Sequence, residues 1–353
     1  MRERVPALGV DRDEWTRRMM HWHFSAETGS RFWTAKRRSL PFDPLRDVVD
    51  FDSLRLFGLF DKNDIRGVRV RDLLPRGFAD RTFRVFETGG TTGESCRIVD
   101  VTRSRYDVEL YHAMMEERGL AGGDVLALVP SGPHAYGHFV ARLAESWQGV
   151  ALFVDFDPRW AREQQRDAGS AEDYVRHLVR QAASLLSSQS PALLFTTSRL
   201  LLALVQELPR PLASYRVRAV CTGGTCCTPE EERYVRERYL AHVPWIDTYG
   251  NTLMGHALQA DPVEEGAPRS YHLPPPFAAM KVVDPANPWQ QVDFGERGRI
   301  LVVTLLEDLF LPNLLERDSA LRVGPHPWFP WEGIAAVRPY ADDAAAAVKD
   351  GVY

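Results

Sequence analysis

The sequence predicts an α/β fold in which a mostly parallel sheet is covered by helices on both faces. Two observations predict this core. Short apolar runs alternate with amphipathic segments of helical length in the middle of the chain, and these runs are apolar at every position rather than at alternate positions. Strands of that composition are buried on both faces. The amino-acid composition changes near residue 265, where proline and β-branched residues become frequent, and this predicts a smaller β-rich subdomain.

The first segment, residues 1–80, is predicted to be helical and irregular. Asp11-Arg12-Asp13 comes directly before Trp15 and Met19. Acidic residues in the first turn favour a helix because the amino-terminal end of a helix carries partial positive charge. The aromatic residues that follow, such as Trp33 and Phe42, are expected to pack in a core, and nothing in this segment identifies a ligand.

The second segment, residues 81–264, is the predicted α/β core. Its expected strands cover residues 125–129, 150–154, 192–195 and 217–221. Its expected helices cover residues 104–119, 133–147 and 172–187, a helix that Ser198 would cap, and a helix from Pro229 to Leu240. The last helix has the clearest start, with Thr228 as N-cap, proline at the first position and Glu231 three residues after the cap.

The third segment, residues 265–353, is the predicted β-rich subdomain. Prolines cluster at 274–276, and Gly295 to Gly298 predicts a turn that leads into a strand over 299–305. Residues 344–347 predict a short terminal helix.

Composition limits the classes of function. The chain has 353 residues, of which 44% are hydrophobic and 26% charged, with a net charge of −5. This balance is typical of a folded soluble protein, and the charge provides no general attraction for nucleic acid or an anionic membrane. The amino terminus has mixed charges, and no apolar run reaches the roughly 18–20 residues that span a bilayer. The four cysteines form no CxxC pair, so we expect no zinc site and a cytoplasmic location.

One loop is rich in groups that bind phosphate. It contains three glycines and three threonines in the order Thr88-Gly89-Gly90-Thr91-Thr92-Gly93. Glycine allows backbone N–H groups to converge, and threonine hydroxyls add donors at the same place, so such a loop can enclose a phosphate chain. The alternative is a surface turn without a ligand, since glycine and threonine are common in turns.

Three further features each follow a predicted strand. They are Thr222-Gly223-Gly224-Thr225, Tyr249-Gly250-Asn251-Thr252 and Arg317-Asp318. Bare glycine backbone accommodates a flat ligand, tyrosine provides a stacking face, and a carboxylate can accept two hydrogen bonds from neighbouring hydroxyls. Ligands of open α/β sheets gather at the carboxyl ends of strands, so these features together predict a nucleotide site.

The order of these motifs resembles the adenylate-forming enzymes, a family of acyl-CoA synthetases, peptide-synthetase adenylation domains and luciferases. Within it, the chain is most similar to the phenylacetate–CoA ligase-like branch, including the short adenylate-forming proteins of phenazine biosynthesis. The resemblance covers roughly residues 15–335. It implies the large N-terminal-type domain of these enzymes, with mostly parallel sheets and a smaller β-rich part.

The resemblance also implies a role for each motif. Thr88 to Gly93 would hold the β- and γ-phosphates of ATP, with Thr92 among the catalytic residues. Gly223 and Gly224 would border the adenine, and Tyr249 would stack on it. Thr252 would contact the α-phosphate, and Asp318 would hold the ribose hydroxyls. Arg97 would provide a cation close to the position where many relatives have a lysine.

The family reaction is the attack of a carboxylate on the α-phosphorus of ATP, with Mg²⁺ as a further cofactor. Two departures from the family pattern are evident. Leu253 occupies the position of the usual magnesium-binding acid, so the ion would rely on phosphates and water. Only 35 residues follow Asp318, whereas relatives continue with a mobile C-terminal catalytic domain, which is therefore expected to be absent.

The carboxylic acid substrate is the least specified part. His134 and Tyr136 follow the strand at 125–129, and Met254 follows the tyrosine motif, so these residues are candidates to line an acyl pocket. The alternative is that they pack between strand and helix. The branch implies an aromatic acid and specialised metabolism, with a homodimer as a possible assembly. Two other functions remain open: a relative that binds nucleotide or acid without turnover, and an acyl-transfer or partner subunit.

Overall fold

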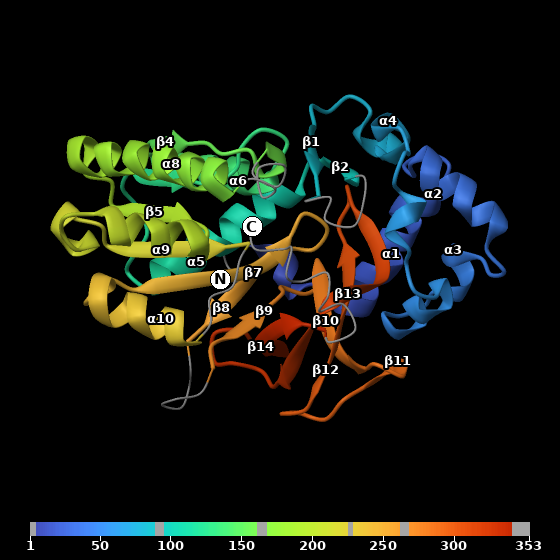
Figure 1. The fold of residues 1–353 in the computed structure, drawn as a ribbon. Coiled ribbons are helices and arrows are strands. Elements are labelled where there is room, and N and C mark those ends of the chain that lie inside the picture. Colours follow the sequence, from blue (N-terminus) through green and yellow to red (C-terminus); the bar gives the residue numbers. More distant parts are fainter. Residues whose placement is uncertain (1–4, 89–94, 161–167, 225–228, 262–267, 341–353) are drawn as a thin grey trace. The chain divides into compact units, whose positions relative to one another are not determined.

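In the computed structural model, the middle of the chain forms parallel strands in the order β7-β6-β5-β3-β4 of a sheet (Figure 1). The structure describes residues 5–88, 95–160, 168–224, 229–261 and 268–340. The strands of this sheet are β3 (Val125–Leu128), β4 (Ala151–Val154), β5 (Leu193–Thr196), β6 (Ala219–Gly223) and β7 (Trp245–Asn251). The predicted α/β architecture is therefore confirmed.

Helices connect these strands and cover both faces of the sheet. They are α5 (Arg103–Glu117), α6 (Ala135–Ser146), α8 (Ala168–Gln189), α9 (Ser198–Glu207) and α10 (Pro229–Val235), with a 3-10 turn at Leu212–Tyr215 and a π-helical turn at Arg236–Leu240. The N-cap of α9 is Thr197 instead of the predicted Ser198, because the Thr197 hydroxyl accepts the backbone N–H of Leu200. The predicted cap Thr228 lies outside the described residues.

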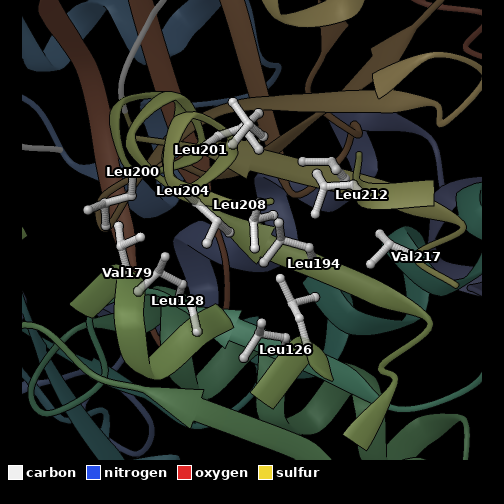
Figure 2. Close-up of a cluster of buried hydrophobic side chains, with 14 of the residues drawn as sticks. Leu126, Leu128, Val179, Leu194, Leu200, Leu201, Leu204, Leu208, Leu212 and Val217 are labelled. Carbon is white, nitrogen blue, oxygen red and sulfur yellow. The ribbon is translucent and has the colours of Figure 1, made fainter. Parts of the chain in front are cut away.

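Successive side chains of these strands point to opposite faces of the sheet and are apolar, so helices must bury both faces. Figure 2 shows Leu126, Leu128 and Leu194 in one cluster with Leu201 and Leu204 of α9. Side chains of α8 join the same cluster. On β5 the next residue, Phe195, contacts the ring of Phe139 from α6 and that of Tyr111 from α5. Adjacent strand residues therefore pack against helices on opposite faces.

An antiparallel region of sheet follows along the chain, with strand order β11-β10-β12-β13-β14-β9-β8. Its strands are β8 (Gly255–Ala260), β9 (Ser270–His272), β10 (Ala278–Asp284), β11 (Asn287–Gln291), β12 (Arg297–Leu305), β13 (Phe310–Val323) and β14 (Gly333–Pro339). A hairpin of β1 (Arg84–Glu87) and β2 (Arg97–Asp100) stands apart from it. The predicted strand at 299–305 lies within β12, and the predicted helix at 344–347 lies outside the described residues.

The amino-terminal segment consists of short helices. They are α1 (Arg12–Phe24), α2 (Arg31–Lys36), α3 (Pro44–Asp47) and α4 (Val70–Leu73), with 3-10 turns η1 to η5 at Pro6–Gly9, Arg37–Ser39, Asp52–Phe57, Lys62–Asp64 and Arg76–Phe78. The helix α1 begins at the predicted place, and Asp11 caps it by accepting the N–H groups of Asp13 and Glu14. None of the helices in the described ranges is long and apolar enough to cross a bilayer.

The chain divides into two compact units at different points from the segments 1–80, 81–264 and 265–353. One unit comprises Met1–Asp107 with Asn251–Ala345, and the other Val108–Gly250 with Ala346–Tyr353. The first and last parts of the chain share a unit because α1 is bonded to the turn between β12 and β13. Trp15 Nε1 donates to the Leu305 carbonyl at 2.8 Å, Trp22 Nε1 to that of Glu307 at 2.6 Å, and His23 Nε2 contacts that of Leu306 at 2.7 Å.

Two buried histidines in this unit make its stability depend on pH. Burial lowers the pKa of His23 and of His272 to about 4, so the folded chain favours their neutral forms. The unfolded chain binds these protons near pH 6.5, and stability is therefore lost as pH falls from 6.5 towards 4. We expect each histidine to account for about 2–3 kcal/mol of the loss between pH 7.5 and 4.5. Urea unfolding of His23→Gln should show a smaller loss over this range than the wild type, and equal losses would contradict the assignment.

Candidate functional site

Thr252, the last residue of the tyrosine motif, meets the strand that leads into the glycine-rich loop within the first unit. The Thr252 hydroxyl donates to the Glu87 carbonyl at 3.3 Å, although the two residues are 165 positions apart. On its other side, the Thr252 carbonyl accepts from Nη1 of Arg103, the first residue of α5. Thr252 is thus held between the last residue of β1 and the start of a helix.

The ends of the glycine-rich loop are joined at the base of the β1–β2 hairpin. The Thr88 N–H donates to the Cys96 carbonyl at 2.9 Å, and the Thr88 hydroxyl accepts the Cys96 N–H at 2.9 Å. The predicted phosphate-binding residues Gly89, Gly90, Thr91, Thr92 and Gly93 lie outside the described residues, so their role stays a prediction. Thr88 retains its hydroxyl proton for a further acceptor, because in this bond its oxygen is the acceptor.

The predicted cation, Arg97, stands directly across the hairpin from Glu87. Its Nε donates to the Glu87 carboxylate at 2.9 Å, and its side chain is 55% exposed. An exposed pair of this kind contributes little to stability, since water competes for both charges. The guanidinium therefore lies beside the residue that Thr252 contacts, with part of its charge balanced by a carboxylate.

The Arg317-Asp318 segment lies where strand β13 bulges. Arg299 of β12 pairs with Ser319, whereas Leu301 pairs with Leu315, so two steps along β12 correspond to four along β13. Residues 316–318 occupy the extra length. Bulges redirect side chains and often occur next to functional sites. Asp318 itself pairs with Pro339 of β14.

In the second unit, the glycine motif and Tyr249 lie at the carboxyl ends of neighbouring strands. Gly223 of β6 pairs in parallel with Thr248 of β7, and Tyr249 follows. Gly224 has a φ of +83°, a conformation that glycine adopts without strain. A Cβ on Gly223 would lie 3.5 Å from the Tyr136 ring. The parallel register therefore places both predicted adenine-binding motifs at one edge of this sheet.

The predicted acyl-pocket residues occupy packed positions. Tyr136 is partly buried, its hydroxyl donates to the Thr196 carbonyl at 3.3 Å, and burial raises its pKa well above the ordinary value. His134 precedes the first residue of α6 and is buried. Met254 is 2% exposed, and its N–H donates to the Asn251 side chain at 3.2 Å. The contact of Tyr136 matches packing between helix and strand, and a pocket role for all three residues stays a prediction.

The position of the expected magnesium ligand belongs to the core. Leu253 is 2% exposed, and its carbonyl accepts the Thr304 hydroxyl at 2.9 Å. Within the described ranges, no group of three or more histidine, cysteine, aspartate or glutamate side chains could hold a metal ion. Among the described residues, the Leu253 position therefore offers no side-chain ligand for a magnesium ion.

Sequence reasoning missed a buried cluster next to Thr252. Asp107 lies 3.2 Å from Nδ1 of His256 and 3.6 Å from Nε of Arg103. Burial opposes the ionisation of Asp107, but His256 and Arg103 outweigh it and hold its pKa below the usual range. Arg103 follows a strand and begins a helix, the same signal that identified the other motifs.

Comparison with known proteins supports the fold. No family model matches the sequence, and no curated protein sequence matches it. Among solved structures, 2-hydroxyisobutyryl-CoA ligase in an open conformation with 2-HIB-AMP and CoA matches with a TM-score of 0.69 and 14% identity, over 95% of this chain and 74% of that chain. The same ligase in the thioesterification state matches with a TM-score of 0.69 and 16% identity, over 94% and 67%.

ATP-bound MatB from Rhodopseudomonas palustris matches with a TM-score of 0.51 and 15% identity, over 73% of this chain and 48% of that chain. This chain shares the fold of these solved structures. It spans about half the length of MatB and between two thirds and three quarters of the ligase. Within the first unit, the bond from the Thr252 hydroxyl to the Glu87 carbonyl links the tyrosine motif to the residue before the glycine-rich loop.

Proposed function

We propose that the chain uses ATP to activate a carboxylic acid. A carboxylate oxygen would attack the α-phosphorus, the bond from this phosphorus to the oxygen bridging the β-phosphorus would break, and pyrophosphate would leave. The product would be an acyl-adenylate. The observation that carries the proposal is the bond from the Thr252 hydroxyl to the Glu87 carbonyl, which joins the tyrosine motif to the residue before the glycine-rich loop.

The proposed roles follow the chemistry of each group. Thr88 and the glycine-rich loop would bind the β- and γ-phosphates, and Thr252 the α-phosphate. Tyr249 would stack on the adenine beside Gly223 and Gly224, and the Asp318 carboxylate would accept the ribose hydroxyls. Two anions must approach one another in this reaction, so fixed donors and the Arg97 guanidinium would act by positioning and electrostatics. We further propose an aromatic acid from specialised metabolism, as the phenylacetate–CoA ligase-like motifs imply.

Pyrophosphate exchange across a panel of aromatic acids tests the proposal. We expect acid-dependent exchange in the wild type and a loss of about 10- to 100-fold in Thr252→Ala, since it removes the hydroxyl proposed to contact the α-phosphate. Asp318→Ala should raise the KM for ATP. Asp293→Ala, which changes an exposed residue of the same unit, should leave the exchange rate and the KM for ATP unchanged. An equal exchange rate in Thr252→Ala and the wild type would refute the role of Thr252.

A second function is favoured by the burial of Leu253. A protein that lacks the metal-binding carboxylate could bind nucleotide or an aromatic acid without turnover, alone or as a partner subunit. Calorimetric titration with ATP separates the two proposals. Binding without exchange for any acid would support the second, and exchange would exclude it.

A further inference from the structure

A buried carboxylate connects two distant segments to the tyrosine motif. Glu316 is 5% exposed and lies in the bulge of β13. Its Oε2 accepts from Nζ of Lys62 at 3.0 Å, and its Oε1 accepts from Nδ2 of Asn251 at 3.1 Å. A buried carboxylate is stable only when its charge and lone pairs are satisfied. Lys62 supplies the charge, and Asn251 supplies the second hydrogen bond.

The Asn251 side chain also binds the backbone around Thr252. Its side-chain oxygen accepts the N–H groups of Leu253 at 2.8 Å and Met254 at 3.2 Å. An amide has donors on one side and an acceptor on the other, so the bond to Glu316 determines which side faces the backbone. The Asn251 side chain thereby closes the turn that contains Thr252.

Lys62 is also connected to the base of the glycine-rich loop. Its backbone carbonyl accepts from the Cys96 thiol at 3.6 Å, and the Cys96 N–H binds Thr88. The Lys62 segment therefore contacts both sequences that meet at the Glu87–Thr252 bond. Its side chain reaches the tyrosine motif through Glu316, and its backbone reaches the loop through Cys96.

We propose that Lys62 and Glu316 are positioning residues for Thr252, acting through the Asn251 amide. This inference rests on the proposed function, in which Thr252 contacts the reacting phosphate. Without the ammonium group, Glu316 becomes an uncompensated buried charge, and the Asn251 amide loses its fixed orientation. The turn over residues 251–254 then loosens, and the Thr252 hydroxyl no longer holds one position.

The first test measures hydrogen exchange at the Leu253 and Met254 amides, which needs no activity. We expect Lys62→Met and Glu316→Gln to reduce the protection of these amides about tenfold, and Lys62→Arg to restore most of it. Lys281→Met is the matched control, since Lys281 pairs with the exposed Asp52 at 3.2 Å in the same unit. Unchanged protection in Lys62→Met would overturn the inference, whatever the enzyme's activity.

The second test separates positioning from stability. At a temperature well below unfolding, we expect Lys62→Met to lower kcat for pyrophosphate exchange about tenfold while the KM for ATP changes less than threefold. Lys62→Arg should recover kcat, and Lys281→Met should match the wild type. Loss of protection without any change in kcat would overturn the positioning role. A wild type with protected amides and no exchange would instead refute the proposed function alone.

Discussion

Replacing Asp308 by alanine is expected to lower the free energy of unfolding by about 3 kcal/mol or more, because it leaves several buried donors without an acceptor. Asp308 is 3% exposed, and one of its oxygens accepts the N–H groups of Val101 and Thr102 at 2.6 Å and that of Arg103 at 3.2 Å. These groups open helix α5, whose first residue binds Thr252. Urea unfolding monitored by circular dichroism measures the loss.

Two variants make this test specific. Asp308→Asn keeps a carbonyl acceptor, and burial, together with the neighbouring Asp100, already raises the pKa of Asp308, so we expect a much smaller loss than for alanine. Asp11→Ala removes an exposed cap that accepts two N–H groups of α1, and should lower the free energy of unfolding less than Asp308→Ala does. Equal losses in the free energy of unfolding for Asp308→Ala and Asp11→Ala would show that the buried cap stabilises the chain no more than the exposed one.

Leu253→Glu, which restores the acid usual at this position, is expected to destabilise the chain by more than about 3 kcal/mol at pH 7, because the new carboxylate would be buried. Leu253 is 2% exposed, and its backbone is bonded on both sides, to Asn251 and Thr304. We therefore expect no gain in exchange activity and no rise in Tm on addition of Mg²⁺. Chemical unfolding and thermal scans with and without the ion provide the two measurements.

Leu253→Met is the matched control. Leucine and methionine have similar volumes, so this change should cost less than about 1.5 kcal/mol. A Leu253→Glu protein as stable as the wild type, with a melting temperature that rises with Mg²⁺, would show that the side chain can turn towards a ligand. That result would contradict the assignment of this position to the core.

Local patterns were sufficient where the responsible interactions are local. The acidic residues before Trp15 predicted the start of α1, and the all-apolar runs predicted strands buried by helices on both faces. Strand β13 was not predicted, because its central residues Glu316, Arg317 and Asp318 are polar and interrupt any alternation. Its pairing with β12 continues across them as a bulge, and that register depends on a partner strand rather than on the residues themselves.

The motifs were visible in the sequence, but the partners of their side chains were not. Glycine, threonine, tyrosine and aspartate after successive strands predicted a nucleotide site. The apolar side chain of Leu253 was enough to show that it is no metal ligand. Only the tertiary structure showed that Thr252 binds the Glu87 carbonyl, that Glu316 joins Lys62 to Asn251, and that Leu253 is buried. The reason is physical: strand ends and turns follow from neighbouring residues, whereas hydrogen bonds between residues 165 or 254 positions apart exist only once the sheets have formed.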